Sequence, residues 1–207
     1  MKFNSNAILE ELEAEVRQLI LTASYLQKED PELLLITPGV GKWSVIQILE
    51  HLNSYGRYYL PAIEKSLQSH KPPKENFTPG WFGNYFMRIM RPGGDGKIRN
   101  KMTSPKDHRP PANPDIKPVM NNFMNQHQQL LNLLEMAKQK NIGATRTPIS
   151  ISRFIKLKVG DTFRFLIAHE QRHFVQIANT IHEIQGVTGK FQSALQAIQH
   201  SPVFSHD

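Results

Sequence analysis

The sequence contains no cysteine, and this absence excludes both disulfide bonds and thiolate metal sites. Any bound metal ion would need histidine, aspartate or glutamate as ligands. No stretch approaches the roughly 18 consecutive apolar residues that a membrane-spanning helix requires. The first residues, Met1 to Asn6, lead directly into a helical pattern without the apolar core of a signal peptide. We therefore expect a soluble, cytoplasmic protein with no membrane partner.

Acidic residues are fewer than basic ones, 18 against 25, so the formal net charge is +7. Much of the basic excess lies between Lys65 and Lys117, and the basic loop 71–109 is its main part. Two interpretations are open: a loop that binds an anion, a nucleic acid or another partner, and a solvated basic loop without a ligand. No nucleic-acid-binding motif accompanies the charge. The second interpretation is therefore favoured, and nucleic acid is not an expected partner.

Four segments carry apolar residues at helical spacing, and no segment has a convincing strand pattern. The expected fold class is all-α, a four-helix bundle in a single domain of residues 1–207 with its core at about 5–185. The expected helices cover residues 5–27, 44–65, 116–140 and 162–185. Expected N-terminal caps are Asn4 or Ser5, Ser44 in a capping box with Gln47, and Asp161 or Thr162.

Residues 66–117 form an unusually long connection between the second and third helices, and proline and glycine interrupt it repeatedly. Only Trp81 to Met90 has helical spacing, and its six large apolar residues indicate that it packs onto the rest of the chain. A connection of this length is usually a functional covering element or partly disordered. It can span the length of a bundle, so the helices that it joins need not be antiparallel neighbours. Residues 186–207 are expected to form a tail with a short helix at 190–199.

His169 and His173 lie four residues apart in the fourth helix, so their imidazoles project from one face, one turn apart. One divalent cation can bind both nitrogens at this spacing. The string from His169 to His173 also satisfies H-E-x-x-H, the signature of zinc peptidases. A peptidase of that class takes its third ligand from a later residue, and no strands are expected for its substrate-binding sheet. The candidates for such a ligand are His182, Glu183, His200 and His206.

His51 offers an alternative third ligand from the second helix. It lies beside the apolar stripe of that helix, on the same side as Tyr55 and Tyr58. Three histidines suffice for an open site in which water takes the next coordination position. Because this set needs no downstream ligand, it is favoured over the peptidase arrangement.

Glu170 lies near the middle of the apolar face of the fourth helix on a helical wheel. A carboxylate in such a place must be paired, metal-bound or protonated, because burying an unpaired charge is costly. Two interpretations are open: Glu170 forms a structural ion pair with a core arginine or histidine, or it lies beside a bound cation. The second is favoured. His127 falls within the apolar face of the third helix, where a hydrogen-bonded cavity histidine is favoured over a fourth ligand.

These motifs together resemble one family. Trp43-Ser44 precedes His51, and more than a hundred residues later comes His-Glu-Gln-Arg-His-Phe-Val-Gln-Ile, which begins at His169. This order and spacing resemble the DinB-like superfamily over about residues 5 to 185. The resemblance implies a four-helix bundle with a divalent metal site, often in a homodimer. Carried over to this sequence, the ligands are His51, His169 and His173.

The resemblance also implies a reaction class. Relatives include metal-dependent hydrolases and transferases or isomerases that use a low-molecular-weight thiol such as bacillithiol or mycothiol. We therefore expect a metal-dependent hydrolase or thiol transferase acting on a small molecule, with zinc or nickel favoured and manganese or iron compatible. Glu170 is the candidate base, and Tyr55 and Tyr58 are candidates to line the pocket. The alternative is a non-enzymatic, stress-related binding module that uses the basic loop 71–109.

Overall fold

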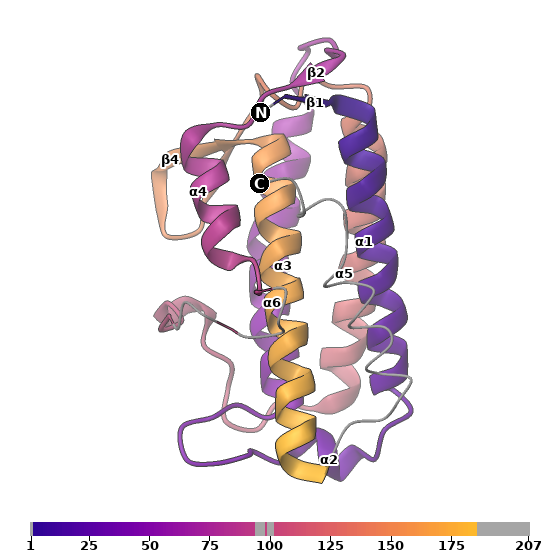
Figure 1. Cartoon of the computed structure of the whole chain (residues 1–207), viewed down its shortest axis with the longest axis vertical. Helices are drawn as coiled ribbons and strands as arrows, with labels where there is room; N and C mark the ends of the chain where they lie inside the picture. Colours follow the sequence, from indigo (N-terminus) through magenta and orange to yellow (C-terminus); the bar gives the residue numbers. More distant parts are fainter. Residues whose placement is uncertain (1, 94–97, 99–101, 186–207) are drawn as a thin grey trace.

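The computed structural model describes residues 2–93, 98 and 102–185, and this part of the chain is mostly helical (Figure 1). The predicted helical fold is thereby confirmed. Each bound of the four long helices lies within three residues of its predicted position, whereas the short helix at Pro31–Leu35 was not predicted. The long helices are α1 (Ser5–Leu26), α3 (Val45–Leu67), α5 (Ile116–Ala137) and α6 (Val159–Gln185). The shorter elements are α2 (Pro31–Leu35), α4 (Trp81–Met90), the 3-10 turn η1 (Lys106–His108), β1 (Phe3–Asn4), β2 (Asn76–Phe77), β3 (Arg146–Ile149) and β4 (Ser152–Lys158).

The four long helices lie side by side, with α1 and α6 running in one direction and α3 and α5 in the other (Figure 1). An ion pair of 2.9 Å between Glu13, early in α1, and Lys138, just after α5, marks the antiparallel pair. The neighbours α3 and α5 are parallel, and the backbone N–H of Asn141 donates to Lys71 O beyond their shared end. The connection between them therefore returns along the length of the molecule, which its length in the sequence permits.

Local sequence signals account for the helix starts. Asn4 caps α1 by accepting from the backbone N–H groups of residues 6 and 7. Ser44 and Gln47 form the predicted capping box of α3. The predicted cap of the fourth helix was wrong, because α6 already begins at Val159, where β4 runs directly into it. Asp161 instead lies in the first turn of α6, and its carboxylate accepts from Gly80 N at the start of α4.

The expectation of a chain without strands was also wrong, because two small antiparallel sheets are present. In the first, Phe3 is paired with Phe77; in the second, Thr147 is paired with Leu157. Strands of two residues carry no detectable alternation. β3 also contains Pro148, which a two-stranded ribbon tolerates because both strands are edges.

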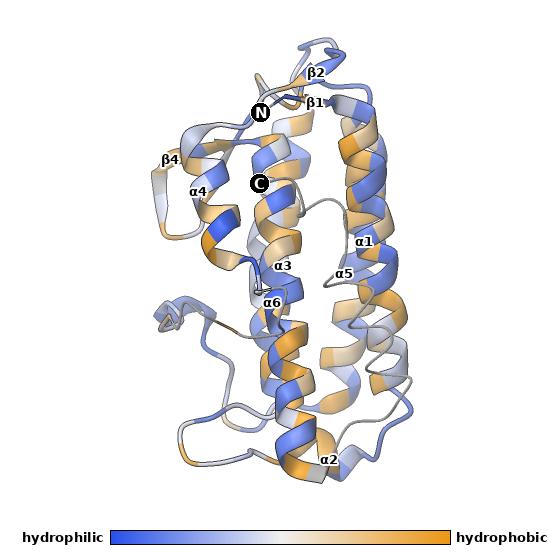
Figure 2. Ribbon diagram, in the orientation of Figure 1, coloured by the Kyte–Doolittle hydropathy of each residue, from blue (hydrophilic) through white to orange (hydrophobic). Residues whose placement is uncertain are grey.

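The core lies between the four long helices, and apolar and polar residues alternate around each of them in Figure 2. As predicted, α4 packs onto the rest of the chain; Gly83 and Met87 are its buried residues, and α6 is its main neighbour. Its other face exposes Trp81 and Tyr85 to solvent. None of the helices in the described part is long and apolar enough to cross a membrane. The predicted tail, residues 186–207, and its helix at 190–199 lie outside the described residues.

Candidate metal centre

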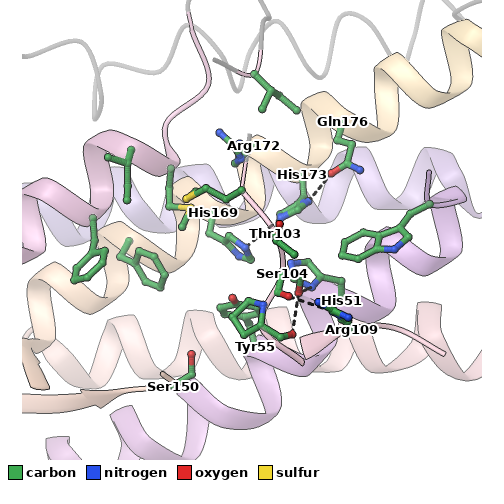
Figure 3. A pocket seen from close by; sticks show the side chains of 18 of the residues that line it. His51, Tyr55, Thr103, Ser104, Arg109, Ser150, His169, Arg172, His173 and Gln176 are labelled. Carbon is green, nitrogen blue, oxygen red and sulfur yellow. Dashed lines mark hydrogen bonds between the residues drawn. The ribbon is translucent and has the colours of Figure 1, made fainter. Parts of the chain in front are cut away.

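Three buried histidines converge between α3 and α6. His51 comes from the second turn of α3, and His169 and His173 come from successive turns of α6 (Figure 3). Each is buried, and one ring nitrogen from each lies within 4.8 Å of the other two. The Nε2 atoms of His169 and His173 are 3.1 Å apart. A tetrahedral zinc ion with bonds of about 2.0–2.1 Å holds two nitrogens about 3.3 Å apart, so the spacing fits one ion.

The outer nitrogens of two of these rings have acceptors that determine the tautomer. His51 Nδ1 lies 2.7 Å from the backbone oxygen of His108, and a carbonyl can only accept, so the proton is on Nδ1. His173 Nδ1 is likewise 2.9 Å from the side-chain oxygen of Gln176. Both rings therefore keep an Nε2 lone pair for a cation. His169 Nδ1 is buried without a hydrogen-bond partner among the described residues.

Burial also keeps the three rings neutral. Loss of hydration lowers the pKa of His51 to about 4. For His169 and His173, burial lowers the pKa well below its ordinary value, and the neighbouring histidines and Arg172 lower it further. Metal binding requires neutral imidazole, so the site does not have to release protons at neutral pH. Convergence, tautomers and charge together fit a divalent cation.

A cavity of about 1300 Å³ opens onto the histidines. Its walls come from α3, α4 and α6, from the loop before α3, from residue 98 and the segment 102–109, and from the β3–β4 hairpin. Polar and aromatic residues of the lining include Tyr55, Ser104, Arg109, Arg172 and Gln176, which Figure 3 labels, and also Trp43 and Tyr59. The cavity is therefore large enough to hold a small molecule beside the three rings.

Tyr55 lies where the sequence predicted, with its ring centroid 4.3 Å from that of His169. Burial raises the pKa of its phenol to about 12, so the group stays protonated and can donate a hydrogen bond. Tyr58, the second predicted tyrosine, is not part of the lining; its hydroxyl donates to Ile149 O and anchors β3. Tyr59 lines the cavity instead, because it lies one full turn after Tyr55 and so shares its face of α3.

Glu170 faces α5 and is not part of the described lining. Its Oε2 lies 3.1 Å from His127 Nε2, and both side chains are buried. The other ring nitrogen of His127 lies 2.8 Å from Phe123 O. Its contact with His127 shows that the side chain of Glu170 is directed toward α5, whereas His169 and His173 contact His51 of α3. Of the two interpretations, the structural pair with a core histidine is the one that this geometry supports. The roles of Glu170 as a base and of His127 as a pocket residue stay predictions, because neither residue belongs to the described lining of the cavity.

Several residues beside the histidines were not among the site residues predicted from the sequence. His108 and Arg109 belong to the long connection, where no periodicity marks them, and His108 is buried against α3. Arg172 and Gln176 had a signal, because each follows a histidine of the cluster by three residues and so shares its face. A helical wheel of α6 therefore predicts two of these four residues, Arg172 and Gln176.

The arrangement of a zinc peptidase is not present in the described part of the chain. The third histidine of the cluster is His51, upstream of the H-E-x-x-H string. Among the downstream candidates, His182 is exposed and Glu183 forms an ion pair of 2.6 Å with Lys42. His200 and His206 lie outside the described residues. Within residues 102–185 the resemblance of the string to a peptidase signature is therefore one of spacing only.

The three histidines lie in a part of the chain that matches a known protein family. The family model described as the DinB superfamily matches residues 8–177. No curated protein and no solved structure matches the chain. The matched range contains all three histidines of the cluster and also the long connection between α3 and α5.

Proposed function

The chain belongs to the DinB superfamily, and on this basis we propose that it is a metal-dependent enzyme in which His51, His169 and His173 bind one divalent cation. The observation that carries the proposal is the convergence of three buried imidazole groups at the floor of a cavity. We further propose that the four long helices form the four-helix bundle of this family. Zinc and nickel are the favoured ions, because neutral imidazole suits both and the site offers no thiolate.

The surroundings of the site define what the chain itself contributes. A bound cation would act as a Lewis acid or lower the pKa of a bound water or thiol. The Tyr55 phenol can donate a hydrogen bond to a substrate oxygen. Arg109 and Arg172 add positive charge to the lining, which suits a substrate that carries or develops negative charge. The three histidines that line the cavity are at most 9% exposed.

Two features favour a thiol-dependent transferase over a hydrolase. The cavity of about 1300 Å³ exceeds the roughly 300–1,000 Å³ of common small-molecule sites, which leaves room for a thiol and an electrophile together. The only carboxylate in the described lining is Glu183, which is paired with Lys42 and is therefore a poor general base. A thiol activated by a cation needs no such base. Hydrolysis remains the second candidate for the same site.

The non-enzymatic alternative requires the basic loop 71–109 to act as one surface. In the described part, Lys71 donates to Ala144 O beyond the end of α3, whereas Arg109 lies beside the first turns of that helix. Ser54, which contacts the residue before Arg109, marks the second place, and Leu67, the last residue of α3, marks the first. The 13 residue steps between them span roughly 20 Å. Lys97, Arg99 and Lys101 lie outside the described residues. The separation favours an enzyme over an anion-binding loop.

A homodimer is also proposed for this chain. Five large apolar side chains on α4 and on the β3–β4 hairpin are more than half exposed, and surfaces of this kind mark protein–protein contacts. They are Trp81, Phe82, Tyr85, Ile151 and Phe154. We define these five residues as the aromatic surface. A second copy of the chain is the proposed occupant.

Elemental analysis of the purified protein, followed by titration of the metal-free protein with Zn²⁺ and Ni²⁺, tests the proposed site. We expect one ion per chain, and a loss of affinity of at least about 100-fold in both His51→Ala and His173→Ala, because each removes one of three ligands. His182→Ala is the matched control, since that histidine is exposed on the same helix. A wild-type protein that purifies without metal and binds none at micromolar concentration would end the proposal. Screens of thiols with electrophiles, and of simple esters and amides, then separate transferase from hydrolase.

A further inference from the structure

The segment 104–109 of the long connection touches α3 at a single turn, beside the metal-site histidine of that helix. The backbone oxygen of His108 accepts from His51 Nδ1 at 2.7 Å. One turn later, Ser54 Oγ lies 2.9 Å from His108 Nδ1. The ring of His108 stacks on that of Tyr55, with centroids 3.9 Å apart. One residue of the connection therefore contacts three residues of α3.

The protons in this cluster can be assigned from its acceptors. Ser54 Oγ lies 2.6 Å from His51 O, which can only accept, so the serine hydroxyl donates to it. The same oxygen must then accept from His108, which puts the proton of that ring on Nδ1. The side chain of His108 is thus held by a hydrogen bond with a defined direction. Its backbone carbonyl is held in place with it.

The rest of the segment supports this position. The backbone N–H of His108 donates to Pro105 O, and the Nε of Arg109 donates to Ser104 O. These bonds close a compact turn whose only buried residue is His108. Tyr55, against which His108 stacks, packs in turn against His169. The turn therefore contacts one metal-site histidine directly and a second through a tyrosine.

We propose that His108 is a positioning residue for the metal site: its ring anchors the segment 104–109 on α3, and its carbonyl orients His51 for metal binding. The inference rests on the proposed three-histidine site. Acceptors behind metal-binding histidines set both tautomer and ring orientation, and their loss typically weakens metal binding about 10–100-fold. Because coupling is reciprocal, a bound cation also holds the segment on α3. Arg109, the next residue, then takes its place in the cavity wall only when the segment is docked.

Zinc affinity of metal-free variants, measured by competition with a chromophoric chelator, tests the first half. We expect His108→Ala to bind Zn²⁺ about 10–100-fold more weakly than wild type, and Ser54→Ala to lose affinity in the same direction. His108→Asn should recover part of the loss, because its amide can donate to Ser54. Lys106→Ala is the matched control from the same turn; it is exposed, and its affinity should stay within about twofold of wild type.

A purely structural role predicts a different pattern. His108→Ala would then lower the thermal stability of the metal-free protein while its zinc affinity stayed within about twofold of wild type, and that outcome overturns the inference. If the wild type itself binds no zinc, the proposed metal site fails, and the role of His108 fails with it. The two failures are therefore distinguishable.

Hydrogen exchange of the wild-type protein tests the second half and needs no variant. The backbone N–H groups of His108 and Arg109 are bonded within the turn. Exchange in a peptide covering residues 102–112 should slow when Zn²⁺ is added, while the peptide of the distant turn after α5 is unchanged. Equal exchange in the metal-free and zinc-bound protein contradicts the coupling, even if His108→Ala does not fold.

Discussion

Glu170 and His127 form a buried polar contact between α6 and α5, with Oε2 and Nε2 3.1 Å apart. Glu170 directly follows His169 in the sequence, yet the two side chains contact different helices. His169 faces α3 and the cavity, whereas Glu170 faces the interior between α5 and α6. This division distinguishes the site from a peptidase, in which the corresponding glutamate lies beside the metal-bound water.

The Glu170→Gln variant tests this structural role. We expect the free energy of unfolding to fall by about 1–3 kcal/mol, because the substitution weakens a buried hydrogen bond. Zinc affinity should stay within about twofold of wild type, since Glu170 makes no contact with the three histidines. Urea denaturation and zinc titration measure the two quantities. Glu183→Gln is the control, because that glutamate is exposed in its pair with Lys42.

The opposite result would restore Glu170 as a catalytic base. In that case Glu170→Gln would keep its stability and its zinc affinity but lose turnover of a substrate by two orders of magnitude or more. Such a loss would require the glutamate to turn toward the cavity during the reaction.

Local patterns in the sequence predicted the helices well. Apolar spacing and the Ser44–Gln47 capping box placed α3 within two residues of its observed bounds. The same spacing put Glu170 in the core face of the fourth helix, and that residue is buried. These features depend on residues within one or two helical turns of each other, and contacts of that range can be predicted from the spacing of residues in the sequence.

Features that depend on distant partners were not predictable in this way. The helical wheel gave the direction of Glu170 but not the helix that lies opposite it, so His127 was not identified as its partner. β1 and β2 have two residues each, and their register joins Phe3 to a residue more than seventy positions later. His108 makes its contacts with α3 across a connection without periodicity. In each case the missing information is which segments are neighbours in space.

Glu15 provides a test of pH dependence. Its buried carboxyl accepts from Gln171 Nε2 between α1 and α6. Burial raises its pKa from 4.5 to about 8, and the hydrogen bond opposes that rise only in part. Between these two values the folded protein holds a proton that the unfolded chain has lost. The contribution of Glu15 to stability therefore falls as the pH rises from 4.5 to 8 and is constant above.

The Glu15→Gln variant removes this titration. We expect the difference in urea midpoint, wild type minus variant, to decrease from pH 5 to pH 8 for the metal-free proteins. The histidines change stability with the opposite sign: their lowered pKa values make stability rise with pH up to about 6.5, the ordinary histidine value. That contribution is common to both proteins and cancels in the difference. Parallel midpoint curves across this range would contradict the assignment.

Gly83 is required for the close approach of α4 to α6. A Cβ atom at this position would overlap the side chain of Asp161, whose carboxylate also accepts from Gly80 N. We expect Gly83→Ala to lower the free energy of unfolding by about 1–3 kcal/mol, because α4 must shift away from its packed position. Chemical denaturation measures the change. Gly39→Ala is the control, since its nearest neighbour would lie 3.8 Å away; equal effects of the two substitutions would contradict the packing argument.

The aromatic surface predicts how the chain associates. Trp81 is 75% exposed and Phe154 is 98% exposed, although the exposure of large apolar side chains to water is unfavourable. If a second copy covers them, Trp81→Ser combined with Phe154→Ser should shift a wild-type dimer toward monomer without lowering the zinc affinity of each chain. Light scattering after size-exclusion chromatography measures the mass. Val40→Ser is the control, because Val40 is a fully exposed apolar residue on the loop between α2 and α3 and is not part of the aromatic surface. A monomeric wild type at micromolar concentration would exclude the homodimer, and a dimer that persists in the double variant would move the interface to another face.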